Sequence, residues 1–296
     1  MSAKPPAARA LVLTDPEFTL FRDLIRNEAG IHLSDSKKSL LFGRLARRVR
    51  DLGLSSFREY YHRLTEVHPE ETEEMLNRIC TNETHFFREP RQFEVLASRL
   101  GDEWETAAAR GARPRALRVW SAACSTGEEP FSLAMTLRQR FPAASGWEID
   151  ILATDLSSAA LGRAAAAVWP ITKAAEIPED LRKEFMLQGT GPKVGSMKAG
   201  PEIRALVRFA RFNLSRDPFS PGGPFDLILC RNVLIYFGRP ARERVLRRLL
   251  GQLAPGGYLF LGHAESLAAL PGAARTIGPA MYKTLEDARP VGPRGR

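Results

Sequence analysis

The sequence predicts an α/β fold: a Rossmann-like domain with a small β insertion, preceded by a small all-α N-terminal domain. The first observation is Leu117–Ser132, where a short apolar run precedes small and polar residues and then apolar residues at helical spacing. This order is typical of a strand, a tight loop and a helix. The second is an apolar run at 149–154 that ends on Asp155, which completes the first half of a nucleotide-binding unit. The third is that apolar stripes at helical spacing fill residues 14–85.

Length, charge and cysteine content limit the class of protein. The chain has 296 residues, 44% of them hydrophobic, which is enough to bury a sizeable core. Its net charge of +9 favours an acidic partner, whether nucleic acid, an anionic membrane or an acidic protein surface. No apolar run approaches ~18 residues, and the N-terminal apolar stretch is too short for a signal peptide. The three cysteines are widely spaced, so we expect a reducing, cytoplasmic setting without disulfides or a zinc site.

The N-terminal domain is expected to contain four helices after a disordered segment at 1–13. Asp15 is predicted to cap the first helix, because Asp accepts hydrogen bonds from free backbone N–H groups and Pro16 suits the first turn. Gly30 can end that helix. The other three helices are expected at 34–51, from Ser55 or Ser56, and at about 70–80.

The second helix has a basic side. Leu41, Leu45 and Val49 form its apolar stripe, so the arginines of the sequence GRLARR lie largely on the opposite side. Most charged helix faces are only solvated, and docking on an acidic partner is the competing interpretation. The residues in question are Arg44, Arg47 and Arg48.

The remaining elements follow in order. Residues 86–114 are expected to be a linker built on one helix, and 115–286 to be the α/β domain. A glycine-rich stretch and the strand after it predict a β insertion at about 188–212. Further strands are expected at 225–229, 258–261 and 281–285, the last of them antiparallel, with a helix at 242–253 and a loose tail at 287–296.

The loop after the first strand favours a ligand that has a ribose but no phosphate. The sequence lacks both G-x-G-x-x-G and G-x-x-x-x-G-K-[ST], and Glu128 and Glu129 at the start of the helix would repel a pyrophosphate. S-adenosylmethionine (SAM) is a common metabolite that combines a ribose with a cationic group. Asp155 could accept hydrogen bonds from ribose hydroxyls, or could only cap the turn at Ser157 and Ser158.

Other polar residues stand where a buried strand ends or where the two domains join. Arg231 and Asn232 follow the strand at 225–230 and need polar partners, which either a ligand or a neighbouring helix could supply. Residues 82–88 mix polar and aromatic side chains and are expected to line a cleft, although Arg88 could instead form an ion pair between the domains.

Three segments together resemble a known family. They are TNETHFFRE (81–89), WSAACSTGEEP (120–130) and FDLILCRNVLIYF (225–237), and they occur in this order. They closely resemble the CheR family of chemotaxis-receptor methyltransferases, and the resemblance extends from about Asp15 to Leu285. It implies a SAM-dependent methyltransferase domain that converts glutamates of methyl-accepting receptors to methyl esters and releases S-adenosylhomocysteine (SAH), without a metal.

The resemblance also implies roles for residues. It assigns the basic helix, with Arg44, Arg47 and Arg48, to the acidic receptor coiled coil, and the β insertion to capture of a C-terminal tethering peptide of the receptor. It assigns catalysis to Arg88 and Tyr236. It assigns cofactor binding to Asn82, Thr84, Arg88, Glu129, Asp155, Asn213, Leu214, Arg231 and Asn232.

Two other functions compete with this one. A nucleic-acid methyltransferase would explain the positive charge, but the place after the fourth strand reads Cys230-Arg-Asn-Val and lacks the Pro-Pro of amino methyltransferases, and no Pro-Cys nucleophile occurs. A catalytically silent module that binds SAM or a receptor is the other. His85 and His263 belong to no cluster with metal-ligand spacing, so both are expected to be structural. We therefore expect a protein substrate, no nucleic acid and no membrane insertion.

Overall fold

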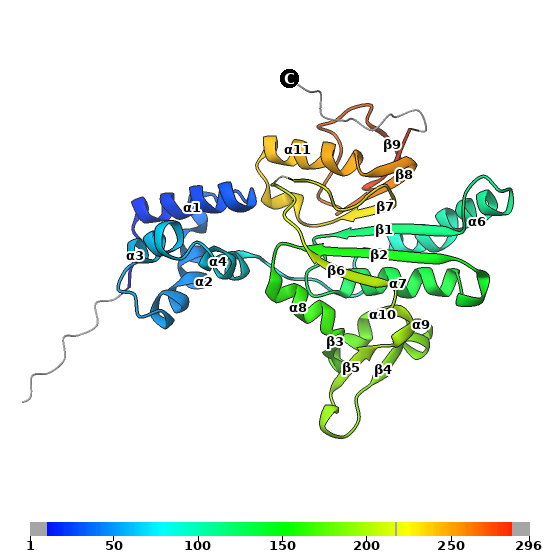
Figure 1. Ribbon diagram of the computed structural model, residues 1–296, viewed down its shortest axis with the longest axis horizontal. Coiled ribbons are helices and arrows are strands. Elements are labelled where there is room, and N and C mark those ends of the chain that lie inside the picture. Colours follow the sequence, from blue (N-terminus) through cyan, green and yellow to red (C-terminus); the bar gives the residue numbers. More distant parts are fainter. Residues whose placement is uncertain (1–10, 217, 286–296) are drawn as a thin grey trace, which may run out of the picture. The chain divides into compact units, whose positions relative to one another are not determined.

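The computed structural model describes residues 11–216 and 218–285, which form two compact units (Figure 1). The chain divides between Thr81 and Asn82, a few residues before the boundary expected at 85/86. Most of the segment expected to be disordered at 1–13, and the tail expected at 287–296, lie outside the described residues. Within the described ranges, no helix is both long and apolar enough to cross a membrane.

The first unit is helical, as the apolar stripes predict. Its first helix is capped by Thr14 rather than Asp15: the Thr14 side chain accepts from the Glu17 backbone N–H, and the Glu17 carboxylate accepts from the Thr14 N–H. Gly30 ends that helix with a φ of 72°, as predicted. The elements are α1 (Asp15–Ala29), η1 (Asp35–Lys37), α2 (Lys38–Asp51), α3 (Phe57–His62), η2 (Arg63–Val67) and α4 (Glu71–Ile79).

Aromatic rings and aliphatic side chains fill the core of this helical unit. Phe21 of α1 is fully buried, and its ring centre lies 6.0 Å from that of Phe57 and 5.9 Å from that of Tyr60. Leu41 and Leu45, from the predicted apolar stripe of α2, are also fully buried. The stripe is therefore the face by which α2 packs into the unit.

An ion pair joins α2 to α4 beside this core. Arg48 donates from Nε to Glu71 Oε1 at 2.8 Å and from Nη2 to Glu71 Oε2 at 2.6 Å, and the Tyr60 hydroxyl donates to Oε1 at 3.0 Å. Burial opposes ionisation of Glu71, but these hydrogen bonds outweigh it and hold the pKa of Glu71 below its ordinary value. Arg48 is therefore part of the scaffold of the helical unit.

The second unit is a doubly wound α/β domain. Its large sheet has seven strands in the order β6-β2-β1-β7-β8-β10-β9, parallel except for β10, which pairs antiparallel with both neighbours. The antiparallel pairing of the last strand was predicted, whereas β9 was not. The strands are β1 (Ala116–Ala122), β2 (Glu148–Asp155), β6 (Val207–Arg211), β7 (Phe225–Cys230), β8 (Leu253–Leu261), β9 (Ala274–Gly278) and β10 (Met281–Thr284).

Helices cover both faces of the large sheet. Successive side chains of a strand point to opposite faces, so Val119 and Trp120 of β1 enter different apolar clusters. Val119 packs in the cluster of α7, and Trp120 in that of α11. These two helices lie on opposite sides of the large sheet (Figure 1). The helical elements of this unit are α5 (Pro90–Val95), η3 (Leu96–Leu100), α6 (Gly101–Ala109), α7 (Glu128–Arg140), η4 (Ala143–Ser145), α8 (Ser158–Ala166), η7 (Leu234–Tyr236) and α11 (Arg239–Leu250).

A small antiparallel sheet is inserted between β2 and β6. Its strand order is β3-β5-β4, and it extends away from the large sheet in Figure 1. The insertion expected at 188–212 is displaced, because β6 lies at the edge of the large sheet and the small sheet begins at Val168. Its elements are β3 (Val168–Pro170), η5 (Ile171–Glu176), α9 (Glu179–Phe185), β4 (Met186–Gln188), η6 (Gly191–Lys193), β5 (Ser196–Ala199) and α10 (Pro201–Arg204).

Replacing Arg48 is expected to destabilise the helical unit. Arg48→Ala leaves the nearly buried Glu71 carboxylate without its cation, so we expect a loss of about 1–3 kcal/mol of unfolding free energy at neutral pH. Hydrogen exchange of the α2 and α4 amides measures this loss within the unit. Arg47→Ala is the matched control, because the Arg47 side chain is 84% exposed.

The same pair predicts a pH dependence. The folded pKa of Glu71 is depressed, so its stabilisation is present above the ordinary pKa of ~4.3 and disappears as the pH falls through the folded value. The difference between Arg48→Ala and the wild type should therefore shrink in acid. A difference that is independent of pH would contradict this account of the ion pair.

Candidate functional site

The site lies where the connections of the large sheet change direction. From β1 the chain passes to β2 and β6 on one side, and it then returns to β7 on the other side of β1. In open α/β sheets, ligands bind beyond the carboxyl ends of the strands at such a switch point. The loop after β1 (123–127) and the segment after β7 (231–236) both lie at this edge, since β1 and β7 pair in parallel up to Ala122 and Cys230.

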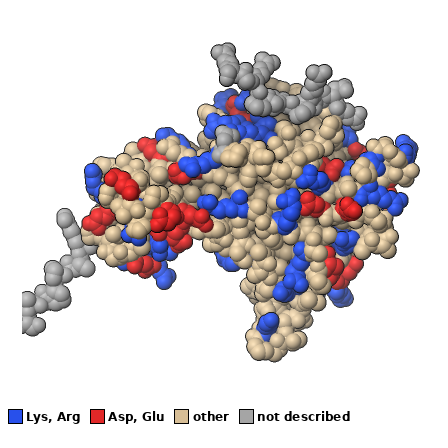
Figure 2. Space-filling model, viewed as in Figure 1, with Lys and Arg blue, Asp and Glu red and all other residues tan. Residues whose placement is uncertain are grey.

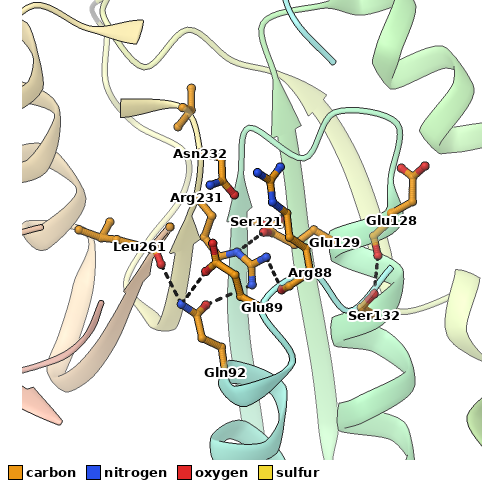
Figure 3. A network of polar contacts seen from close by, with 12 residues as sticks. Arg88, Glu89, Gln92, Ser121, Glu128, Glu129, Ser132, Arg231, Asn232 and Leu261 are labelled. Carbon is orange, nitrogen blue, oxygen red and sulfur yellow. Dashed lines mark hydrogen bonds and ion pairs between the residues drawn. The ribbon is translucent and has the colours of Figure 1, made fainter. Parts of the chain in front are cut away.

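A buried ion pair joins these two segments. Arg231, directly after β7, places its Nε 3.1 Å from Oε2 of Glu129 in the first turn of α7 (Figure 3), with side-chain exposures of 2% and 11%. The guanidinium also donates to Gln92 Oε1 at 3.1 Å and to the Arg88 carbonyl oxygen at 2.5 Å. Among the described residues, Nε itself has no acceptor in hydrogen-bond alignment, so its attraction to Glu129 is that of an ion pair. Arg231 therefore has the polar partners that its position after a buried strand was expected to require, and neighbouring helices and the Arg88 backbone supply them.

The surroundings of Glu129 set its ionisation. Burial raises the pKa of Glu129, and the Arg231 cation and the Ser121 hydroxyl, which donates at 2.6 Å, oppose that shift. Burial also raises the pKa of the Cys124 and Cys230 thiols well above the ordinary value. Both thiols are therefore protonated at neutral pH and act as small buried side chains.

Asp155 serves the backbone on both sides of the site. Its Oδ2 accepts from the Ser125 N–H at 2.8 Å and its Oδ1 from the Ser157 N–H at 2.9 Å, so it holds the loop after β1 and also caps the turn into α8. Burial raises the pKa of Asp155, and these backbone hydrogen bonds oppose the rise. A carboxylate has about four acceptor positions, and the backbone hydrogen bonds from Ser125, Leu156 and Ser157 leave one of them for a ribose hydroxyl. The two roles weighed for Asp155 are therefore compatible.

Residues 82–89, which we call the connector, are fixed by side chains of the second unit. Its carbonyl oxygens at Asn82, Thr84 and Arg88 accept from Ser125, Lys173 and Arg231. Its backbone N–H groups at Phe86 and Phe87 donate to Glu176 at 2.9 Å and to Ser132 at 3.0 Å. The segment that carries three of the predicted site residues is therefore held in one conformation by its backbone.

Glu265 is a residue of the site edge that the sequence analysis missed. It lies in the loop after β8, is 7% exposed, and accepts four backbone N–H groups at 2.7–3.0 Å. No local pattern identifies it, because most of its donors lie about thirty positions earlier in the chain. The donors are Gly262, Asn232, Val233 and Leu234.

Strained backbone gathers around this edge. Seven non-glycine residues in the described part of the chain have positive φ, and five of them lie in the connector, the loop after β1 or the segment after β7. Each left-handed residue costs about 1–2 kcal/mol. Such strain persists only where the surrounding contacts enforce it, as those of Asp155, Glu265 and Arg231 do here. The five are Phe87, Glu89, Ala123, Ser125 and Asn232.

The remaining predicted site residues of this unit take no part in the Arg231 network through their side chains. Asn213 Oδ1 accepts from the Ser215 N–H at 3.0 Å, so its side chain forms a turn after β6. Leu214 packs in the cluster of Trp120. Arg88 Nη1 donates to the Glu83 carbonyl at 3.4 Å, whereas the half-buried Tyr236 makes no hydroxyl hydrogen bond to any described residue.

The three arginines of the basic helix belong to the other unit and differ in exposure. Arg44 donates to the Ile79 carbonyl and to Thr81 Oγ1, and Arg48 pairs with Glu71. Arg47 is exposed, and its nearest ionic contact is Asp51 at 3.8 Å. Helical periodicity predicts the polar side correctly, but it does not reveal which of its arginines another helix covers.

The donor set at the sheet edge fits a nucleoside with a cationic group. The Asp155 carboxylate is an acceptor of the kind that ribose hydroxyls require, and it already holds the Ser125 N–H at 2.8 Å, so this donor is not free for a phosphate. Backbone conformation and packing both require a glycine at position 127: its φ is 97°, and a Cβ there would meet Ala164 Cβ at 3.0 Å and the Trp169 ring at 3.5 Å. Across residues 11–216 and 218–285, no group of three or more His, Cys, Asp or Glu side chains could hold a metal ion.

Both units match models of known families. The model described as "CheR methyltransferase, all-alpha domain" matches residues 16–80, and that described as "CheR methyltransferase, SAM binding domain" matches residues 82–282. The chain is 38% identical over 269 residues to chemotaxis protein methyltransferase 2 of Pseudomonas aeruginosa, which covers 91% of this chain and 93% of that protein. It is 37% identical over 282 residues to the chemotaxis protein methyltransferase of Escherichia coli, with 94% and 93% covered.

Glu265→Gln should loosen the segment after β7. A glutamine offers one carbonyl oxygen and turns an NH₂ group toward backbone donors, so some of the four N–H groups lose their acceptor, at about 1–3 kcal/mol. We expect faster hydrogen exchange at Val233 and Leu234 and a lower melting temperature. Glu184→Gln, on the exposed surface of α9, is the control. Equal exchange in both variants would contradict the role given to Glu265.

Proposed function

Because this chain belongs to the CheR methyltransferase family, we propose that it transfers the methyl group of SAM to glutamate side chains of chemotaxis receptors. The products are glutamate methyl esters and SAH. The chain is a SAM-dependent methyltransferase with relatives named for chemotaxis. The observation that carries the proposal is the network of Glu129, Arg231 and the connector at the switch point of the sheet. It links the three segments on which the family resemblance rests.

The cofactor is assigned to this edge of the sheet. Asp155 would accept from a ribose hydroxyl, and Asn213 and Leu214 would border the adenine, with the amide at its edge and the leucine on its face. Glu129, held by Arg231, would face the amino-acid portion. Asn82, Thr84, Arg88 and Asn232 complete the proposed set.

The transfer itself requires little acid–base chemistry. Bound SAM would supply a methyl group on a sulfonium, which is a good leaving group. A glutamate is already ionised at neutral pH, with an ordinary pKa of ~4.3, so no general base is needed. The protein's contribution is then to hold the carboxylate in line in a site with little water. Arg88 and Tyr236 are proposed to orient it, and a partial contact from Arg88 would leave the carboxylate nucleophilic.

The receptor is proposed to dock through the exposed side of α2. Receptor helices that carry target glutamates are acidic, and an arginine on the helical unit would attract them. Arg47 is the best candidate of the three arginines, because Arg44 and Arg48 are occupied by contacts within their own unit. Acidic and basic side chains are interspersed over the helical unit on the face drawn in Figure 2, so a few positions rather than the total charge would decide the contact.

The small sheet is proposed to take a tethering peptide of the receptor. Its outer strands β3 and β4 each pair with β5 on one side only within the described residues. An extended peptide can add to such an edge through main-chain hydrogen bonds. Leu187, 53% exposed on β4, offers an apolar contact there.

Methyl transfer to receptor carboxylates tests the function directly. We expect the protein, incubated with receptor and methyl-labelled SAM, to label the receptor, and the label to leave as methanol in mild base, as an ester does. Arg88→Ala should reduce the rate about 10- to 100-fold, if it removes one charged hydrogen bond to the reacting carboxylate. Its melting temperature, compared with that of the wild type, serves as the control for folding.

Two results would overturn the proposal. One is label that resists base, because N-methyl groups are stable under those conditions. The other is label found on nucleic acid while the receptor stays unlabelled. A normal rate in Arg88→Ala would remove Arg88 from the mechanism but would leave the reaction class intact.

Arg47→Glu should slow receptor methylation without changing SAH affinity. The reversal places a negative charge before an acidic partner, whereas Arg47 belongs to a different unit from the cofactor residues. Added salt should slow the wild type as well, since exposed charges are screened over ~8–10 Å. Arg58→Glu, an exposed arginine on α3, makes the same change in net charge and is the control. Equal methylation rates in the two variants would contradict a receptor contact by Arg47 and would show that its side chain is only solvated.

A further inference from the structure

One short element of the small-sheet insertion, η5, binds the backbone of the connector. Two of its side chains bind the connector backbone on either side of His85. Lys173 Nζ donates to the Thr84 carbonyl at 3.0 Å, and Glu176 Oε2 accepts from the Phe86 N–H at 2.9 Å. The insertion is therefore in contact with the segment to which cofactor residues are assigned.

Lys173 also binds the first residue of α7. Its Nζ lies 2.6 Å from Glu128 Oε1, and Glu128 is 1% exposed whereas the Lys173 side chain is 26% exposed. Glu128 Oε2 accepts from Thr126 Oγ1 at 2.7 Å, so both of its oxygens have partners. The lysine thus joins the connector to the start of α7, and Glu128 in turn holds Thr126 of the loop after β1.

A neighbouring aromatic contact strengthens the same junction. Trp169 of β3 lies with its ring centre 5.0 Å from Phe86 of the connector and 5.2 Å from Phe131 of α7. Its Nε1 donates to the Thr126 carbonyl at 3.3 Å. The beginning of the insertion therefore packs against the connector, the loop after β1 and α7, and this packing restricts how far the nearby Lys173 ammonium can move.

We propose that Lys173 is a positioning residue for cofactor binding: it fixes the Thr84 carbonyl and thereby the connector at the edge of the SAM site. This inference rests on the proposed assignment of the cofactor to that edge. Among the described residues, Lys173 is the donor that holds the Thr84 carbonyl. Its loss would allow the connector to shift, and the main consequence would be weaker binding of SAM and SAH.

A purely structural role for Lys173 makes a different prediction. If the lysine only neutralised Glu128, removing both charges together would restore a normal protein, because no buried charge would remain unpaired. The double variant Lys173→Met/Glu128→Gln separates the two roles, since it removes the charge imbalance while the Thr84 carbonyl still loses its donor. Lys173→Arg is the conservative variant, because a guanidinium can donate to both acceptors.

The test combines binding, kinetics and melting on the full chain. For the double variant we expect a melting temperature near that of the wild type, a Kd for SAH and a KM for SAM about 5- to 20-fold higher, and kcat at saturating SAM within about twofold. Lys173→Arg should recover most of the affinity. Lys183→Met, whose side chain is 71% exposed on α9 of the same insertion, should leave both constants unchanged.

The outcomes separate this inference from the proposed function. A wild-type protein that binds no SAH would overturn both together. Wild-type binding with unchanged SAH affinity in the double variant would overturn the positioning role alone and reduce Lys173 to the counterion of Glu128. An equal loss of affinity in Lys183→Met would also contradict the role, because the effect would then belong to the insertion in general.

Discussion

The site depends on one buried cation. The Arg231 guanidinium is almost excluded from solvent at the end of β7, and a charge in that position is tolerated only if it is paired and hydrogen-bonded. Its partners come from the first turn of α7, from α5 and from the connector: Glu129, Gln92 and the Arg88 carbonyl oxygen. Because one planar group binds all three, none of these segments can shift without leaving a buried charge or donor unsatisfied. The positions of two large-sheet loops and of the connector are thereby set together.

At this edge, carboxylates of the protein bind the backbone N–H groups of the loops, whereas in a glycine-rich phosphate-binding loop such groups bind the ligand. Asp155 and Glu265 each accept several backbone N–H groups, and the loops that they hold contain left-handed residues which would relax without those contacts. The edge is therefore rigid and suits a ligand with hydroxyl and cationic groups. These are the groups that SAM presents, and carboxyl methylation needs orientation more than proton transfer.

The sequence predicts the fold and part of the site. Contacts between residues far apart in the chain are the part that it does not predict. Asp155 and Arg231 are predictable because each follows a buried apolar run where a polar group requires partners. Glu265 and Lys173 are not, because their partners lie about thirty or more positions away and no short pattern connects them. The basic helix has the same cause, because helical periodicity could not reveal that α4 covers Arg48.

The small sheet was misplaced because its strands have only three or four residues. The charge of the chain left a nucleic-acid substrate open, and the chemotaxis relatives favour a protein substrate.

A double-mutant cycle on Arg231 and Glu129 tests most directly whether this pair organises the site. The cycle compares Arg231→Met, Glu129→Gln and the double variant in both unfolding and SAH binding. If the two residues act as one unit, we expect a coupling free energy of about 1–3 kcal/mol in unfolding. We also expect each single variant to lose SAH affinity and the second change not to double that loss. Effects on both quantities that add within about 0.3–0.5 kcal/mol would contradict this role of the pair, because two independent residues would then hold the segments separately.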